Sequence, residues 1–313
     1  MAMTHQTRPV DAVVSGYNVF LAAVWLTVVS NAGYAPAIFA AHVAAAALPL
    51  FLNRAPRDLA RPVQILREIY PLLFVLAFWT ELGYLRELYH VGVHDQIVTA
   101  WDLRVFGQHF NLTWMPRMPA VWLSEVMHFI YYAYYPLIFI PVIAVGLMGR
   151  HTAMRDMTFR LAVTYLGCYA LYLWFPVDGP AALLPHYQGD LTQGFWYQLV
   201  QAAHDSGDSL GTAFPSSHVA GSVTIAYLAW RWLPRGWAWL IIAETVGVCF
   251  ATVYTQNHYA IDALGGLVWA TVLQVVAAPL IRTAFSRAPV ERFPLPVFPR
   301  LDPEAELSTG GGS

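Results

Sequence analysis

The sequence predicts an all-α fold, a polytopic membrane helical bundle of about eight transmembrane helices. Two observations predict this class. Hydrophobic residues make up 58% of the chain and charged residues only 12%, far from the norm of a soluble domain. The apolar residues also gather in runs long enough for membrane spans, which need about 20 mostly apolar residues each. The candidate spans are residues 12–31, 33–52, 69–89, 120–148, 159–176, 217–233, 237–255 and 258–281.

The distribution of arginine predicts the orientation of these spans. The chain has no lysine, so all 17 basic residues are arginine, and positive charge marks the cytoplasmic side of a membrane protein. With the N-terminus in the cytoplasm, fourteen arginines fall on the inner side and only Arg86, Arg104 and Arg117 outside. We therefore expect an integral protein of a bacterial inner membrane, with both termini cytoplasmic. A Golgi-type membrane would give the same topology. Alternatively, the first span could be a cleaved signal peptide, and its loss would leave the orientation of the outward-facing segments unchanged.

Two outer segments have helical periodicity. Ile97, Trp101 and Val105 recur every four residues among polar neighbours, and the segment 195–203 repeats this pattern. The spacing predicts helices that lie in the membrane interface. They could serve as anchors or as a lid over a lipid-accessible site. The Pro-rich segment after Pro289 is typical of a disordered cytoplasmic tail.

A histidine and an aspartate stand four residues apart where the last span begins. His258 and Asp262 can touch at this spacing, and Asn257 is the predicted N-cap of the helix. A carboxylate that accepts the Nδ1 proton of an imidazole leaves Nε2 free as a nucleophile or base. An aspartate inside a span also needs a partner, so this motif alone is equally compatible with a structural pair.

A second polar motif, Pro215-Ser216-Ser217-His218, opens the span two before it. Pro215 suits the first turn of a helix, and the amides of the next three residues would form an anion site at the helix N-terminus. His218 can act there as a general acid, although alone it could be a capping or interfacial histidine. Both motifs fall on the same, non-cytoplasmic side. Two histidines and a carboxylate in this arrangement favour a phosphoryl-transfer site.

With these motifs the chain resembles the type-2 phosphatidic acid phosphatase superfamily of membrane lipid phosphatases and phosphotransferases. The resemblance rests on Phe214-Pro215-Ser216-Ser217-His218 and on His258-Tyr259-Ala260-Ile261-Asp262-Ala263-Leu264-Gly265-Gly266. It implies a six-helix phosphatase-like core. It also implies that His258 attacks phosphorus and becomes a phosphohistidine, that Asp262 orients it, and that His218 protonates the leaving group.

The resemblance also divides the chain. We expect residues 1–68 to hold two additional N-terminal transmembrane helices and a cytoplasmic linker, residues 69–285 to form the catalytic core, and residues 286–313 to be the tail.

The chain departs from the family pattern at its cationic positions. Family phosphatases usually have an arginine six residues before the nucleophilic histidine, where this chain has Thr252, and a Lys-x6-Arg-Pro motif, although the chain has no lysine. Arg54 with Arg61-Pro62 imitates that motif, but on the predicted cytoplasmic side. A phosphate monoester is largely a dianion and needs more cationic stabilisation than a monoanionic diester. The pattern therefore resembles the branch of inositol phosphorylceramide synthases and, more distantly, sphingomyelin synthases.

Other polar residues of the outer side are candidate substrate contacts. Arg86 is the best placed outer cation, although a salt bridge with Glu81 or Glu87 would explain it as well. The outer half of the fourth span carries a stripe of polar and aromatic residues that includes Glu125, His128 and Tyr132. A belt of tyrosines at the membrane interface would also explain this stripe. The full set of candidate contacts is Ser216, Ser217, Asp178, Arg86, Glu125, His128 and Tyr132.

These observations predict a membrane phosphotransferase that moves a phospho-alcohol head group between lipids. A lipid phosphate phosphatase and a non-enzymatic membrane bundle such as a transporter are the alternatives. The expected partners are a phospholipid donor and a ceramide-like lipid alcohol acceptor, with no nucleic acid. No cofactor and no metal are expected, because a histidine nucleophile needs no activated water and the three catalytic side chains are otherwise employed. The identity of the head group and the oligomeric state stay open.

Overall fold

The computed structural model describes residues 8–54, 60–89, 92–207 and 209–285. Over these residues the chain is helical and contains no strand; an isolated parallel bridge joins Val177 and Thr212. The all-α class is confirmed. The predicted tail, residues 286–313, lies outside the described residues.

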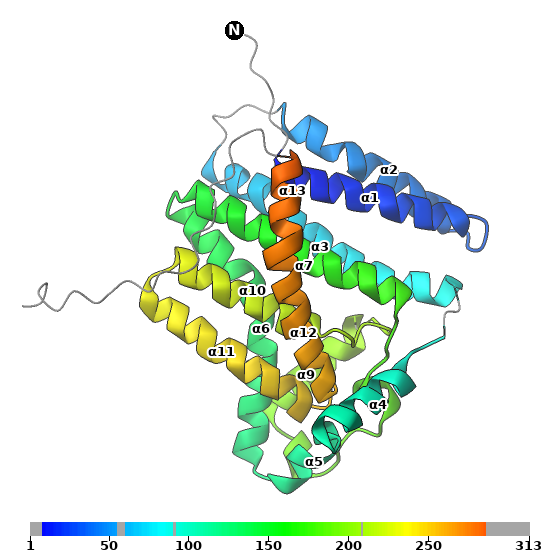
Figure 1. The fold of residues 1–313 in the computed structure, drawn as a ribbon, viewed down its shortest axis with the longest axis vertical. Helices are drawn as coiled ribbons and strands as arrows, with labels where there is room; N and C mark the ends of the chain where they lie inside the picture. Colours follow the sequence, from blue (N-terminus) through cyan, green and yellow to red (C-terminus); the bar gives the residue numbers. More distant parts are fainter. Residues whose placement is uncertain (1–7, 55–59, 90–91, 208, 286–313) are drawn as a thin grey trace, which may run out of the picture.

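Eight long helical segments coincide with the eight predicted spans (Figure 1). They are α1 (Pro9–Thr27), α2 (Ala35–Leu52), α3 (Arg61–Tyr89), α6 (Val121–Leu147), α7 (His151–Trp174), α10 (Ser217–Trp232), α11 (Arg235–Tyr254) and a last one in which a π turn (Leu273–Ala277) joins α12 (Ala260–Val272) to α13 (Ala278–Phe285). Helices α3 and α7 each begin eight residues earlier than their predicted spans.

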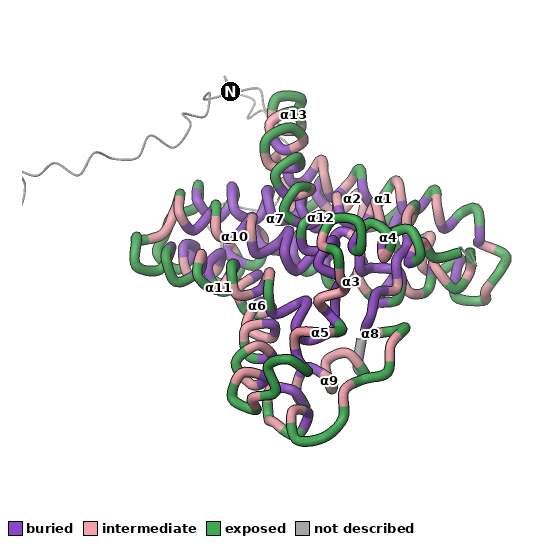
Figure 2. Tube along the Cα trace, turned by 60° about the horizontal axis from the view of Figure 1, so that its bottom comes forward, coloured by how far each residue is buried: buried purple, intermediate pink, exposed green. Residues whose placement is uncertain are grey.

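Six of these segments are long and apolar enough to cross a membrane, while α7 and α10 are not. Helix α10 has only 16 residues, and α7 contains Arg160 and several tyrosines. Both pack against neighbouring helices, and most of their residues are buried (Figure 2). Because other helices cover them, they need less apolar surface than a helix that faces lipid.

Five short helices, α4 (Asp95–Phe106), α5 (Phe110–Arg117), α8 (Pro180–Leu183), η1 (Asp190–Thr192) and α9 (Phe195–Gly207), lie in the segments that follow α3 and α7. Figure 1 shows α4, α5 and α9 at the end of the bundle where α12 begins. Helices α4 and α9 confirm the two helices predicted from apolar periodicity. We call this end the site end.

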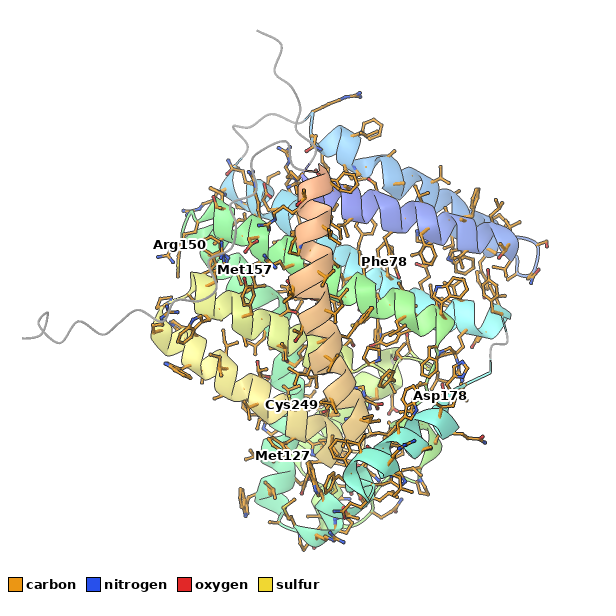
Figure 3. The ribbon with its side chains drawn as sticks, viewed as in Figure 1. Phe78, Met127, Arg150, Met157, Asp178 and Cys249 are labelled. Carbon is orange, nitrogen blue, oxygen red and sulfur yellow. The ribbon has the colours of Figure 1, made fainter. Side chains whose placement is uncertain are left out.

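Ion pairs gather at the opposite end of the bundle. Glu68 accepts hydrogen bonds from Arg8 at 2.7 Å and from Arg155 at 2.8 Å. Asp156 accepts one from Arg160 at 3.2 Å and another from Arg282. Figure 3 shows Arg150 and Asp178 near opposite ends of α7. Among the residues that the structure describes, the paired arginines predicted as cytoplasmic are therefore concentrated away from the site end.

A buried polar cluster fastens the N-terminal helix pair to α3. His42 of α2 has its Nε2 atom 2.8 Å from Glu81 Oε1 and its Nδ1 atom 2.9 Å from Asn18 Oδ1. Trp25 of α1 donates its indole N–H to the same carboxylate. An ionisable group inside a span needs such partners. Glu81 is thus engaged by α1 and α2, which excludes it as the salt-bridge partner expected for Arg86.

Candidate active site

His258 is fixed immediately before α12 by contacts on both sides. Its backbone N–H donates to the carbonyl of Thr252, 2.9 Å away at the end of α11. Its Nδ1 atom lies 3.4 Å from Asp262 Oδ2, which also accepts the backbone N–H of Tyr259 at 2.8 Å. The N-cap is Tyr259, so the prediction of Asn257 was wrong by two residues. The two catalytic candidates meet because Asp262 reaches back to the residues before its own helix.

His218 lies in the first turn of α10, which begins at Ser217. Ser216 is the N-cap, and its hydroxyl accepts the backbone N–H of Val219 at 3.3 Å. Pro215 precedes the cap and is not in the first helical turn as predicted. The amide of Ser216 donates to the carbonyl of Asp262 at 3.0 Å. This bond joins the two sequence motifs directly, and it removes one amide from the predicted anion site.

The rings of His218 and His258 lie next to each other in an edge-to-face arrangement. Their centroids are 5.7 Å apart and the ring planes are nearly perpendicular, at 65°. The His218 ring stacks on Tyr131 with centroids 4.7 Å apart, and its Nε2 atom lies 3.4 Å from the Tyr135 hydroxyl. Both histidines are buried, with exposed fractions of 7% for His218 and 5% for His258. Helices α6, α10 and the start of α12 thus hold two imidazoles in one enclosed space.

Gly266 allows α12 to approach the start of α10. A Cβ atom at this position would lie 2.5 Å from the Ser216 carbonyl oxygen and 3.1 Å from Val219 Cβ. Real Cβ contacts are not that short, so any other residue would push the two helices apart. The glycine at the end of the motif that begins at His258 therefore permits the close approach in which Ser216 bonds to Asp262.

The two histidines open on a cavity of about 190 Å³ at the site end, which we call the polar cavity. Four of the eleven histidines of the chain line it. Its ionisable lining residues are Asp178, His186, His204, Asp205, His218 and His258. Among the described residues that line it there is no arginine.

Arg86, which contacts the lining residue Asp178, is neutralised by that contact. Its Nη2 atom donates to Asp178 Oδ2 at 2.6 Å. Burial raises the pKa of the Asp178 carboxyl, with a smaller upward contribution from Asp95, while Arg86 opposes both. Arg86 therefore lies at the cavity wall in an ion pair. Its partner is Asp178, whereas the sequence suggested Glu81 or Glu87.

Helix α4 holds the backbone of the site through two aspartates. Asp95 accepts the backbone N–H groups of Asp178 and Gly179, both at 2.9 Å. Asp102 accepts that of Ile261 at 3.0 Å, in the first turn of α12, and its other oxygen lies 2.7 Å from His109 Nδ1. The helix that the sequence suggested as an anchor or a lid thus holds the loop after α7 and the first turn of α12 in place. Asp95 and Asp102 were missed, although their spacing of seven residues places them on one helix face.

A second cavity, of about 270 Å³, adjoins the polar cavity and is mostly apolar; we call it the apolar cavity. Helices α3, α6 and α7 supply most of its wall, which includes Val75, Leu76, Tyr132, Ile138 and Tyr169. Ser217 lines it as well. Trp79, His204 and His218 line both cavities. The predicted contact Tyr132 is therefore on the apolar side of the site.

Four predicted contacts, Ser216, Arg86, Glu125 and His128, line neither of these two cavities, and the last two bind other parts of the fold instead. Glu125 accepts the backbone N–H groups of Trp196 at 3.1 Å and Tyr197 at 3.2 Å, so it caps the start of α9. His128 is fully buried, and its Nδ1 donates to the Ser124 carbonyl at 2.7 Å. Glu125 thereby holds α9 against α6, because a helix N-terminus needs acceptors for its free amides, and the His128 ring contacts that of Tyr197 in α9, with centroids 4.8 Å apart.

The sequence offered little signal for the remaining polar lining residues. His186, Asp205 and Asn257 stand in loops or at a helix end, where no periodicity marks the inward face. His204 directly continues the apolar pattern predicted for 195–203, and that pattern would have placed it one helical turn from Val200. Among these, His204 was the residue open to prediction.

The Arg54 and Arg61 imitation of the family motif lies far from the site. Arg61 begins α3 and Arg86 is near its end, so the 25 residues between them span about 38 Å of helix. The position that family phosphatases fill with arginine, Thr252, is fully buried and uses its carbonyl to hold His258. The geometry supports the interpretation of the Arg54 motif as a coincidence.

Comparison with known families agrees with the motifs. A family model described as PAP2 superfamily matches residues 98–276, more than half of the 313 residues. The chain belongs to the PAP2 superfamily. No curated protein and no solved structure matches it. The PAP2 match runs from α4 to the π turn after α12, so it contains both histidine motifs and leaves α1, α2 and α3 outside. Membership, with the apolar helices, makes the chain an integral membrane protein and a phosphatase-type enzyme that acts on lipid phosphates or phosphate esters.

Proposed function

We propose that the protein is a membrane phosphotransferase that moves a phospho-alcohol head group from a phospholipid to a lipid alcohol, as inositol phosphorylceramide synthases do. One observation carries the proposal: the polar cavity contains both histidines, yet its described lining has no arginine, and the chain has no lysine. Arg86, the cation beside it, is paired with Asp178.

This charge balance favours a diester substrate. Phosphoryl transfer depends on positioning and on cationic stabilisation of the phosphoryl oxygens. A monoester dianion would bring two charges into a cavity whose described lining has no arginine and whose neighbouring Arg86 is neutralised by Asp178. A diester brings one, which hydrogen bonds from imidazole and backbone N–H groups can meet.

The proposed reaction has two steps. In the first, His258 Nε2 forms a bond to phosphorus while the bond from phosphorus to the diacylglycerol oxygen breaks, and His218 gives that oxygen a proton. In the second, His218 takes the proton of the acceptor hydroxyl, whose oxygen attacks phosphorus and releases His258. In both steps Asp262 accepts a hydrogen bond from the Nδ1–H group of His258, which keeps the Nε2 atom of His258 available for the bond to phosphorus. No step requires a metal ion.

The apolar cavity supports a lipid as the acceptor. His218, which exchanges the proton with the alcohol, lines both cavities. A hydrocarbon chain in the apolar cavity would therefore bring its polar end to the general acid. We infer a ceramide-like alcohol as acceptor and a bacterial inner membrane as location, with the site end facing the periplasm, because the arginines gather at the other end.

The alternative is a lipid phosphate phosphatase, in which water resolves the phosphohistidine. The proximity of Arg86 favours it, because breaking the pair with Asp178 would supply a cation at the cavity wall. Ser217, Asp178 and Arg86 are the candidate contacts to substrate in either reaction, whereas Ser216 is buried and already uses its amide and its hydroxyl within the fold.

Product analysis separates the two functions. Purified protein receives a head-group-labelled phosphatidyl-alcohol with and without ceramide, and separately a lipid phosphate monoester. We expect the label to move to ceramide, the activity to persist in EDTA and the His258→Ala variant to be inactive. Free phosphate from the monoester as the only product would refute the transferase, and activity in the His258→Ala variant would refute the assigned nucleophile.

A further inference from the structure

A third histidine occupies the junction of the two cavities. Only Trp79, His204 and His218 are shared by the linings described for the polar and the apolar cavity. His218 is the proposed general acid, and Trp79 is largely apolar. His204 is therefore, besides the general acid, the shared side chain that can both donate and accept a hydrogen bond.

His204 is also fixed relative to the catalytic histidines. It lies in α9, and its Nε2 atom is 3.3 Å from the Tyr131 hydroxyl. The ring of Tyr131 stacks on that of His218 with centroids 4.7 Å apart, and its edge contacts the ring of His204 at 5.8 Å. One tyrosine of α6 thus sets the positions of both imidazoles at the junction.

The chemistry of a lipid alcohol indicates what His204 would meet. A ceramide-like alcohol carries its amide and second hydroxyl, and a diacylglycerol its esters, between the reacting oxygen and the hydrocarbon chains. With the reacting oxygen at His218 and a chain in the apolar cavity, these polar groups would lie at the junction. A polar group brought out of water needs a hydrogen-bond partner there.

We propose that His204 is a specificity-determining residue that hydrogen-bonds the polar group next to the reacting oxygen of the lipid alcohol. This rests on the proposed function for the identity of the reaction. His204 then selects ceramide-like alcohols over simple long-chain alcohols, which have a hydroxyl and a chain but nothing between them. Its role is separate from proton transfer, which belongs to His218.

A comparison of two acceptors tests this role. The KM values for ceramide and for 1-hexadecanol are measured with wild-type protein and with His204→Phe, which keeps an aromatic ring and removes the hydrogen bond. We expect KM for ceramide to rise roughly 3- to 10-fold and KM for hexadecanol to stay unchanged. His204→Gln, which keeps a donor and an acceptor, should restore most of the preference.

His186→Phe is the matched control, because His186 lines only the polar cavity; its ratio of KM values should equal that of wild type. An equal change of both KM values in His204→Phe, or none, would overturn the proposal. If the protein transfers to no alcohol and releases only phosphate, the transferase fails, and the same comparison is made with ceramide 1-phosphate and hexadecyl phosphate. A selective rise for ceramide 1-phosphate would still support the role of His204.

Discussion

Arg86 donates a 2.6 Å hydrogen bond to Asp178 at the wall of the cavity that contains His258. This pair decides how much positive charge a phosphate in the cavity would experience. Replacing Asp178 with asparagine keeps the size of the side chain and leaves Arg86 uncompensated. The freed Arg86 could then donate a charge-assisted hydrogen bond to the phosphate. We therefore expect the preference for a lipid phosphate monoester over a diester, measured as the ratio of the two kcat/KM values, to rise roughly 10-fold.

The matched control for this variant is Asp190→Asn, an exposed aspartate in η1 outside the described cavity lining. Its ratio should equal that of wild type. An unchanged ratio in Asp178→Asn would show that the ion pair does not set the substrate charge.

The raised pKa of Asp178 predicts a pH dependence of the same ratio. Burial favours the neutral carboxyl, so Asp178 takes up its proton at a higher pH than an ordinary aspartate does. As the pH falls through that pKa, Arg86 loses its partner and the preference for monoesters should increase. In Asp178→Asn this component should be absent, so a parallel pH profile in both proteins would contradict the assignment.

The general acid can be identified through the leaving group. An alkoxide needs a proton as it departs, whereas p-nitrophenolate does not. His218→Ala should lose roughly 10²- to 10⁴-fold in kcat on a dialkyl phosphodiester and much less on the p-nitrophenyl ester. His258→Ala should lose activity on both substrates. Equal losses on the two esters in His218→Ala would assign His218 another role.

Asp102 is expected to support α12 from α4. It is fully buried and accepts the N–H of Ile261, so Asp102→Ala leaves that amide without an acceptor, at a cost of about 1 to 3 kcal/mol. We expect a lower melting temperature in detergent together with a lower kcat, since His258 and Asp262 frame the same turn. Gln96→Ala, an exposed site on the same helix, should change neither. A stable Asp102→Ala variant with full activity would show that α4 is dispensable.

The close approach at Gly266 makes a separate prediction. Gly266→Ala places a Cβ atom against the carbonyl of Ser216, which must separate the two motifs or destabilise the bundle. Activity should fall sharply. Gly16→Ala, where a Cβ atom meets nothing within 4 Å, is the control. Wild-type kcat in Gly266→Ala would mean that the motifs need not be in contact.

The sequence predicted most of the fold because apolar runs report on helices that face lipid. The weak cases were α7 and α10, since burial inside the bundle relaxes their composition. His218, His258 and Asp262 were open to prediction because each stands near a helix start, where local spacing sets geometry. The spacing of Glu125 and His128 fits a polar stripe on α6, but only the structure shows α9 packed against both residues. The loop residues His186 and Asn257 reach the cavity through the folding of distant segments, which no local pattern encodes.

The central claim is that His258 carries a phospho-alcohol during turnover. The most direct test is to mix the protein with a phosphatidyl-alcohol, quench within one turnover, and determine by mass spectrometry the group attached to His258. We predict a mass equal to the phosphorylated head group, removed by a chase with ceramide and absent from the His258→Ala variant. A mass equal to phosphate alone, removed by water with or without ceramide, would contradict the account.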